Sequence, residues 1–508
     1  MSAGIIGIIA AIIIYLGGMI LIGYRFSKNN ETVNEFYLGG RKLGPLAVAM
    51  SAEASDMSSW LLMGLPGVAY LTGVADAAWT AIGLAIGTYF NWLIVAKRLR
   101  LYTAKTNSIT VPAFFSDRYR DSRRVLTLIS AIIIIVFFVP YTASGFAACG
   151  KLFGSLFNAD YHVAMIISAI VIITYTALGG FMAVSITDLI QSIVMSIALI
   201  VILLFGVQSA GGLAAVNANA RSLAGYLSLT AMHDAATGSS VPYGFITILS
   251  TLAWGLGYFG MPHILLRFMA IEDENKLKIS RRVGTVWVVI SMAVSVFIGI
   301  IGNAASVKGA IPVLAGSDSE TVIVRFASLL AENGFLFALI AGVVLAGILA
   351  STMSTADSQL LTASSAVSKD LLSDVFHHEM DEQKTMTVSR LTLIAIAIIG
   401  IFFAWDSTSS VFKIVSFAWA GFGASFGPVM LLALFWKRSN RQGALAGMVT
   451  GGVMIFVWKY LVRPLGGALD IYELLPAFLL ALAVNVTVSL LTPAPEQEIV
   501  QEFESIGR

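Results

Sequence analysis

Strongly apolar stretches of about 20 residues recur from one end of this chain to the other. An α-helix of that length crosses the roughly 30 Å hydrocarbon core of a bilayer. The stretches are too long and too uniformly apolar for the strands of a membrane barrel. Only 12% of the 508 residues are charged, whereas soluble domains have roughly 25%. The sequence therefore predicts an all-α membrane protein with a single polytopic domain over residues 1–508.

Hydropathy predicts thirteen transmembrane helices. They cover residues 4–25, 44–70, 74–96, 125–153, 161–178, 182–207, 243–269, 283–305, 334–368, 386–404, 411–436, 442–461 and 472–492. Most of the 31 Lys and Arg residues fall on one side of this alternating path, in the loops 25–43, 97–124, 267–282, 369–390 and 437–441 and in the tail. Basic loops stay in the cytoplasm. We therefore expect a bacterial inner-membrane protein with its N-terminus outside and its C-terminus in the cytoplasm.

Several other function classes find no support in the sequence. The basic segment 97–124 is interpreted as a loop that faces lipid headgroups, and we expect no nucleic-acid partner. No GxxxxGK[ST] phosphate loop is present, which argues against an ATP-driven pump. We expect no enzymatic activity, no organic cofactor and no obligatory protein partner. A passive channel or a transporter-derived sensor is the alternative class, although a sensor would need an appended signalling domain and only about 17 residues follow Leu491.

Two predicted spans contain residues that a simple lipid-facing helix would avoid. Residues 49–60 (AMSAEASDMSSW) place the acids Glu53 and Asp56 among four serines. Residues 254–263 (WGLGYFGMPH) contain three glycines and a proline. Gly and Pro permit a helix to unwind, and paired interrupted helices indicate the binding site of a transporter. We expect the acids to need a cation, a proton or another partner, because no Lys or Arg of the sequence is assigned to a span near them.

The ninth predicted span supplies hydroxyl groups. Its segment 350–358 reads ASTMSTADS, with the adjacent hydroxyls of Ser354 and Thr355. Asp357 and Ser358 follow on nearly the same helix face. Hydroxyl, carbonyl and carboxylate oxygens are the ligands of hard cations, although such serines also join helices by hydrogen bonds.

With these motifs the chain closely resembles the solute:sodium symporter family, and within it the bacterial sodium/proline symporters. The resemblance covers nearly the whole chain. It rests on residues 38–45 (LGGRKLGP), 54–57 with 60–67, 179–188 (GGFMAVSITD), 254–263, 353–355 and 417–423 (FAWAGFG).

The resemblance implies the leucine-transporter-type fold, with two inverted repeats of five helices. The extra helix would be 4–25, repeat one about 44–207, repeat two about 243–436, the two additional helices 442–492 and the cytoplasmic tail 493–508. By position, the resemblance implies that sodium is held by the carbonyls of Ala54, Met57 and Ser351 and by the hydroxyls of Ser354 and Thr355. It assigns Asp56 to sodium coupling. It implies a substrate site lined by Tyr141, Trp254, Tyr258, Met261 and Pro262, with Ser58 and Trp60 close by.

Three residues depart from the sodium/proline pattern. Glu53 stands where relatives have glycine, Met261 replaces glutamine, and Asp357 replaces a small hydroxyl residue. With Asp188, which some relatives use for a second sodium, the core would then hold four acids. A second coupling cation near Asp188, Asp357 and Ser358 would compensate them, as would a proton on Glu53 or Asp357, or a cationic substrate paired with Glu53. A permanently protonated acid held by serine hydroxyls is the fourth possibility.

We predict a secondary active symporter that imports a small amino acid, with proline as the first choice, driven by the sodium gradient through alternating access. The alternative is a cation- or proton-coupled importer of a cationic amino acid or polyamine that uses Glu53 and Asp357. The first prediction places the ion and the solute at one interrupted segment, 54–60, because a ligand shifts a conformational equilibrium only through its different affinities for the two states.

Overall fold

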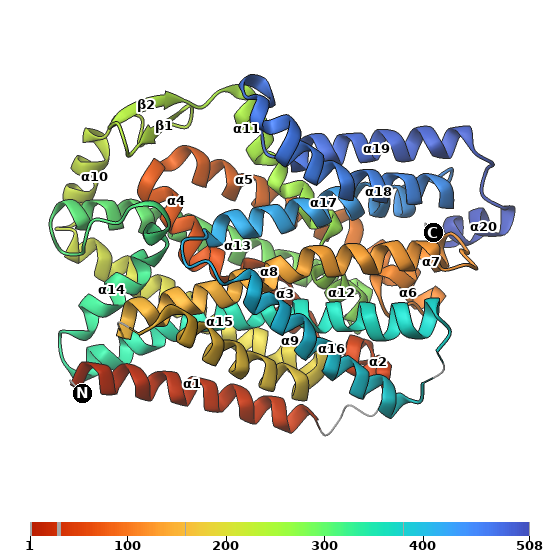
Figure 1. Ribbon diagram of the computed structural model, residues 1–508, viewed down its shortest axis with the longest axis horizontal. Coiled ribbons are helices and arrows are strands. Elements are labelled where there is room, and N and C mark those ends of the chain that lie inside the picture. The colour runs from red at the N-terminus through yellow and green to blue at the C-terminus, as the bar shows by residue number, and fades with distance from the viewer. Residues whose placement is uncertain (1–2, 28–31, 158, 379, 507–508) are drawn as a thin grey trace.

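The computed structural model describes residues 3–27, 32–157, 159–378 and 380–506. Helices form most of the molecule, and the long ones run close to its long axis (Figure 1). Helix α1 starts at the left-hand end of this view, and α20 lies at the right-hand end. Among the described residues the sheet structure is one antiparallel hairpin, β1 (Ala231–Asp234) with β2 (Ser239–Pro242). The predicted all-α class is therefore confirmed.

The long helices follow the predicted hydrophobic segments closely. The first half of the chain forms α1 (Ala3–Ser27), α3 (Pro45–Ser59), α4 (Leu65–Thr72), α5 (Val74–Phe90), α6 (Ala96–Thr106), α8 (Val125–Phe157) and α9 (Tyr161–Ser209). The second half forms α11 (Phe245–Leu252), α12 (Pro262–Ala270), α13 (Leu277–Val307), α15 (Phe335–Ser365), α16 (Glu382–Phe403), α17 (Val411–Phe435), α18 (Arg441–Val457) and α19 (Leu474–Leu491). Shorter helices are α2 (Val33–Leu38), α7 (Val111–Arg118), α10 (Leu213–Ser222), α14 (Val322–Ala331) and α20 (Gln497–Ile506).

Local sequence signals explain where several of these helices begin. Proline opens α3 and α12 at the first helical position, where its missing N–H costs no hydrogen bond. The Asp160 carboxylate accepts the first free N–H groups of α9, and the Asn440 side chain does the same for α18. These caps satisfy backbone donors that a helix terminus leaves open.

The number of spans differs from the sequence prediction. Among the described residues, ten helices are long and apolar enough to cross a membrane, or eleven if the bent pair Phe245–Gly260 and Pro262–Ala270 is one span. By helix length and composition, the structure therefore does not reach the thirteen predicted spans. The first shortfall is the predicted span 44–70, which is divided between α3 and α4. The second is the predicted span 161–178, because its apolar segment Tyr161–Thr174 is short and α9 continues past it through a kink at Gly180 (φ 64°, ψ −175°).

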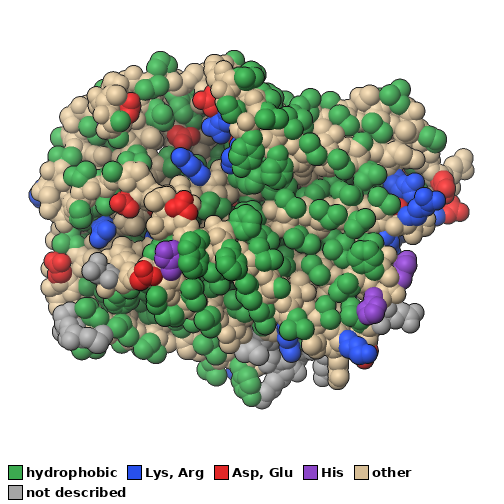
Figure 2. All heavy atoms as spheres, viewed as in Figure 1, with side chains coloured by type: hydrophobic (Ala, Val, Ile, Leu, Met, Phe, Trp, Pro, Cys, Tyr) green, Lys and Arg blue, Asp and Glu red, His purple; other side chains and the backbone are tan. Residues whose placement is uncertain are grey.

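Helix α15 lies at the centre of the helix packing, in contact with α1, α3, α8 and α9. Its residues from Val344 to Ser365 are all buried. Figure 2 shows hydrophobic side chains across the middle of one face, and a cluster of basic and acidic side chains at the end where α20 lies. An apolar outer band with charges toward the ends is the surface that a bilayer requires. The buried hydroxyls of α15 are therefore shielded from lipid by the surrounding helices.

Candidate ion and substrate site

The first broken helix comprises residues 45–72. Its helical backbone is interrupted at Ser58, which has φ 32° and ψ −171°. A π-helical segment, Trp60–Gly64, then leads into α4. A serine rarely adopts a positive φ, and non-helical backbone at membrane depth is tolerated only inside the protein or beside a cavity. The predicted interruption within residues 49–60 is confirmed, at Ser58.

The second broken helix comprises residues 245–270. After α11 the chain forms a tight 3₁₀ segment, Ala253–Gly260, and Met261 is extended (φ −76°, ψ 108°) before α12 begins at Pro262. The two parts are bent by 47°. The glycines allow close packing, since a Cβ added at Gly257 would overlap the indole ring of Trp419. The interruption predicted here from Gly and Pro is also confirmed.

The structure brings the first broken helix and α15 together at the predicted ion ligands. The Ser354 hydroxyl donates a hydrogen bond to the Ala54 carbonyl oxygen at 2.8 Å and lies 3.2 Å from the Ser351 carbonyl oxygen. The Thr355 hydroxyl is also 3.2 Å from the Ser351 carbonyl. The carbonyl of Met57 directly precedes the interruption at Ser58. All five residues are buried.

This ligand set consists of carbonyl and hydroxyl oxygens. Such oxygens suit a hard cation, and the hydroxyl lone pairs become available to an ion when the hydroxyl hydrogens turn away from the carbonyls. Among the described residues, no group of three or more His, Cys, Asp or Glu side chains is arranged to hold a metal ion. The arrangement therefore fits a single weakly held cation better than a transition metal.

Asp56 connects the two broken helices. One of its carboxylate oxygens accepts a hydrogen bond from the Tyr258 hydroxyl, and the other has no hydrogen-bond partner among the described residues. The Tyr141 hydroxyl points at the Asp56 carbonyl oxygen from 3.4 Å. The Asp56 side chain thus faces the second broken helix, while the neighbouring backbone at Ala54 faces α15. A movement of either broken helix would therefore change the hydrogen bond between the Asp56 carboxylate and the Tyr258 hydroxyl.

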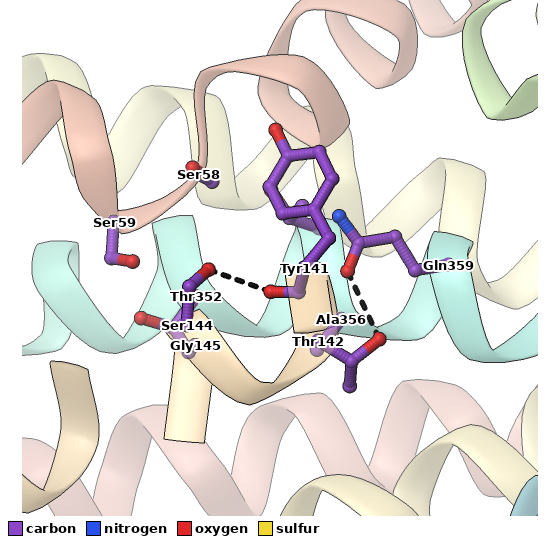
Figure 3. Close-up of a pocket in the computed structure, with 10 residues that line it drawn as sticks. Ser58, Ser59, Tyr141, Thr142, Ser144, Gly145, Thr352, Ala356 and Gln359 are labelled. Atoms are coloured by element: carbon purple, nitrogen blue, oxygen red, sulfur yellow. Dashed lines mark hydrogen bonds between the residues drawn. The ribbon is translucent and has the colours of Figure 1, made fainter. Parts of the chain in front are cut away.

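A narrow cavity lies beside the interruption at Ser58. It lies between the first broken helix, α8 and α15, as the close-up in Figure 3 shows. Its lining residues are Ser58, Ser59, Tyr141, Thr142, Ser144, Gly145, Thr352, Thr355, Ala356 and Gln359. In this structure the lining side chains close on one another and leave no room for a water molecule. Because Thr355 lines it, the cavity adjoins the candidate ion ligands.

Aromatic rings of the predicted substrate site pack together near this cavity. The ring centroids of Trp60 and Trp254 are 6.2 Å apart, and those of Tyr258 and Trp419 are 5.1 Å apart. The Trp419 indole N–H donates to the Trp254 carbonyl at 2.8 Å. Ser58 and Tyr141 line the cavity itself, whereas the other predicted substrate residues do not. Those residues, all buried, are Glu53, Trp60, Trp254, Tyr258, Met261 and Pro262.

Glu53 faces away from the cavity. Its Oε1 oxygen accepts hydrogen bonds from the Trp92 indole at 2.7 Å and from the Thr88 hydroxyl at 3.1 Å. A Cβ added at Gly284 of α13 would lie 2.8 Å from the same oxygen. The carboxyl group is therefore held between α13, α5 and the segment that follows α5, and it does not line the cavity.

Asp188 has a basic partner, which corrects the sequence analysis. Arg267 was assigned to the cytoplasmic loop 267–282, and no Lys or Arg was expected near the acids. In the structure the Arg267 side chain is 1% exposed and its Nη2 lies 3.2 Å from Asp188 Oδ2. The same guanidinium donates to the hydroxyls of Ser358 at 2.6 Å and Ser51 at 3.0 Å. Asp357, by contrast, accepts a hydrogen bond from the Thr176 hydroxyl.

Comparison with known proteins identifies the family. A model of the sodium:solute symporter family matches residues 36–451. The chain belongs to this family. The predicted family resemblance is confirmed, and the matched range includes both broken helices and α15.

Relatives of this symporter are proline transporters by name. It is 42% identical to a sodium/proline symporter of Haemophilus influenzae, over 97% of this chain and 96% of that one. It is 41% identical to a high-affinity proline transporter of Bacillus subtilis, over 96% and 98% of the two chains. An osmoregulated proline transporter of the same organism is 40% identical over 98% and 97%. These relatives are transporters, as expected, and not enzymes.

Two solved structures show the fold of this symporter. A sodium-coupled sialic acid symporter, in a substrate-bound outward-open state, matches with a TM-score of 0.78 at 18% identity, over 97% of this chain and 99% of that one. A nucleobase-cation symporter matches with a TM-score of 0.54 at 14% identity, over 93% and 98%. At these identities the likeness establishes the fold alone.

Several polar residues of this symporter escaped the sequence reasoning. Gln359 lines the cavity, and its side-chain oxygen accepts from Thr142 at 3.1 Å while its NH₂ group has no partner among the described residues (Figure 3). Its sequence signal is an amide one helical turn after Thr355, on the same helix as the predicted hydroxyl ligands. Lys151 forms a buried ion pair with Glu320 at 2.7 Å. The sequence could not predict this ion pair, because the two residues are 169 positions apart in the chain.

Proposed function

We propose that the chain imports a small amino acid, with proline as the first candidate, driven by the sodium gradient. The observation that carries this proposal is the 2.8 Å contact between the Ser354 hydroxyl and the Ala54 carbonyl, beside the interruption at Ser58 and its cavity. The names of the relatives, at about 40% identity over nearly the whole chain, support both the ion and the solute.

Sodium would be held by the carbonyls of Ala54, Met57 and Ser351 and by the hydroxyls of Ser354 and Thr355. Three of these residues belong to α15 and two to the first broken helix. Bound sodium would thus add a link between two helices that already pack against each other. Asp56 supplies negative charge next to this site and a hydrogen bond to the second broken helix. Sodium and the solute then stabilise the same arrangement, which is the condition for coupling.

The solute would bind between Ser58 and Tyr141 once the side chains that close the narrow cavity move apart, and it would extend toward the aromatic rings of Trp60, Trp254 and Tyr258. Met261 and Pro262 follow directly at the start of α12. Apolar rings suit the ring of proline, and the N-terminal end of a half-helix favours a carboxylate. The alternative, a cation- or proton-coupled importer of a cationic amino acid or polyamine, would need Glu53 at the solute. Its contacts with Trp92 and Thr88 disfavour that role.

We further propose thirteen spans arranged as two inverted repeats, about 44–207 and 243–436. The eleven spans found by length become thirteen when the first broken helix and the segment Tyr161–Thr174 are added. An odd number places the termini on opposite sides, and α1 and α20 do extend to opposite ends of the molecule (Figure 1). With the basic loops in the cytoplasm, the N-terminus would be outside, in a bacterial inner membrane.

Uptake by the purified chain in proteoliposomes tests the proposal. Labelled proline, other amino acids and polyamines would be offered under an imposed sodium gradient or an imposed proton gradient. We expect proline to accumulate with the inward sodium gradient and not with the proton gradient at equal sodium. Accumulation of lysine or a polyamine driven by protons alone would contradict the proposal and favour the alternative.

A further inference from the structure

The segment between α18 and α19 reaches across to the second broken helix. Its residue Tyr472 stacks on the indole of Trp254, with ring centroids 5.1 Å apart and ring planes inclined by 22°. Among the described residues this is the closest and most nearly parallel ring contact that Trp254 makes. An aromatic side chain predicted to line the solute site is therefore held by a residue that the sequence analysis did not consider.

Two hydrogen bonds fix the position of Tyr472. Its backbone N–H donates to the Ser250 hydroxyl of α11 at 2.7 Å, and its own hydroxyl donates to the Ser416 carbonyl of α17 at 2.7 Å. A buried tyrosine needs such a partner for its polar end, while its ring face remains available for stacking. Tyr472 thus joins α11 to α17 and places its ring flat against Trp254 between them.

Charged residues tie this segment to the ends of its two helices. Glu473 follows Tyr472 directly, and its side chain is 1% exposed. Its carboxylate pairs with Arg463 at 3.2 Å and with Lys459 at 3.7 Å. The Lys459 ammonium also lies 4.2 Å from the centre of the Phe417 ring on α17, which is within the range of a cation–π contact. The backbone that carries Tyr472 is therefore anchored on both sides.

In the proposed orientation Tyr472 approaches Trp254 from outside the cell. Helix α18 begins after the basic loop 437–441, which we place in the cytoplasm, so the segment after α18 is external. Tyr472 also lies beyond residue 451, where the match to the family model ends. The last two helices, which stand outside the two proposed repeats, thus reach the solute site from the side on which an imported solute enters.

We infer that Tyr472 is a positioning residue of the solute site, which holds the Trp254 indole over the solute and limits the size of the ring that fits beneath it. The inference rests on the proposed function, because Trp254 has to lie at the solute. Tyr472 is not among the residues that line the cavity, so it acts through Trp254. An indole that cannot move away covers the five-membered ring of proline and excludes a larger ring. Tyr472 therefore contributes to the selection of the solute.

The test compares uptake of proline with uptake of its six-membered-ring homologue, piperidine-2-carboxylate, by proteoliposomes under a sodium gradient. Tyr472→Leu removes the stacked ring, so the KM for proline should rise about 2- to 10-fold at an unchanged maximal rate. The preference for proline over the homologue should fall by a similar factor. Tyr472→Phe keeps the ring and should return both values to within about twofold of the unmodified chain.

Tyr460→Leu is the matched control for the loss of a tyrosine ring. Tyr460 also belongs to the segment after α18, but it is 60% exposed and its ring contacts Phe417 and Phe456. A folded Tyr472→Leu protein with the KM and the preference of Tyr460→Leu would overturn the inference. Equal increases of KM in Tyr472→Leu and Tyr472→Phe would also overturn it, because the stacked ring would then not be the cause. Thermal unfolding in detergent verifies folding.

A second variant keeps the test decisive if Tyr472→Leu does not fold. Glu473→Gln leaves the Tyr472 ring in place but weakens its anchor, so KM should rise about 2- to 5-fold with a loss of preference in the same direction. Asp470→Asn is its control, because Asp470 forms an exposed ion pair with Arg463. Equal results for these two variants would overturn the inference. Failure of the proposed function would be seen separately, as an unmodified chain without sodium-driven proline uptake.

Discussion

The first and second broken helices interrupt their backbones in different ways. The first breaks at one residue, Ser58, within a segment rich in serine and acid, and its Ala54 carbonyl accepts a hydrogen bond from the Ser354 hydroxyl of α15. The second unwinds gradually through the glycines of Ala253–Gly260 and packs its aromatic rings against α17. A sharp polar break suits the capture of an ion, whereas a glycine-rich aromatic break suits the covering of an apolar solute. The hydrogen bond between Tyr258 and Asp56 joins the two functions.

Removing the charge of Asp56 should have the largest effect, because it acts on both broken helices at once. Hydrogen bonds to charged groups contribute about 1.5–3 kcal/mol, so we expect Asp56→Asn to lower sodium-driven proline uptake by about 10- to 100-fold. Asp76→Asn is the matched control, since Asp76 also accepts from a tyrosine, Tyr243, at 2.9 Å but lies away from the cavity. Equal losses in the two variants would indicate a purely structural role for Asp56.

Ser354→Ala should change the sodium dependence of uptake and leave the proline dependence unchanged. The change removes one hydroxyl ligand and the contact with the Ala54 carbonyl, so the sodium concentration for half-maximal uptake should rise about tenfold. At saturating sodium the apparent proline affinity should stay close to that of the unmodified chain. Ser365→Ala is the control, because this buried serine of α15 donates to its own helix, at the Thr362 carbonyl. An unchanged sodium dependence of Ser354→Ala would remove this serine from the proposed site.

Gly257→Ala should affect the solute side. The added methyl group would overlap the Trp419 indole, and overpacking of this kind costs about 1–3 kcal/mol. We expect proline affinity to fall about 5- to 100-fold, with a smaller change in the sodium concentration for half-maximal uptake. Gly244→Ala, at the start of the same broken helix, is the control, because a Cβ there meets nothing within 4 Å. If Gly257→Ala changed sodium and proline dependence equally, the two breaks would not be functionally distinct.

The sequence predicted where the helices break but not how all their polar residues pair. Gly and Pro interrupt a helix at the position where they occur, and an acid inside a membrane span is costly at its own position. These residue types therefore indicated residues 49–60 and 254–263 from the sequence alone. Arg267 was assigned to a loop because it lies near the end of an apolar segment. The apolar residues ILL precede it, and the apolar FMA and then the polar IEDENK follow it, so hydropathy alone places a membrane boundary there. Its partners Ser51 and Asp188 come from distant parts of the chain. The two helices predicted at 161–178 and 182–207 do meet at the non-helical Gly180, where the chain bends without a connecting loop.

Glu53→Gln should have the smallest effect, although Glu53 lies only three residues from Asp56 in the first broken helix. The glutamine carbonyl can still accept from Trp92 and Thr88, so we expect proline uptake within about threefold of the unmodified chain and no change in the preference for proline over lysine. Trp92→Phe provides the contrast. It removes a donor from a buried carboxyl group and should lower thermal stability, because an unsatisfied buried polar group costs about 1–3 kcal/mol. A Glu53→Gln protein that gained or lost uptake of a cationic solute would place Glu53 at the substrate, and the assignment of ion and solute to separate broken helices would then have to be revised.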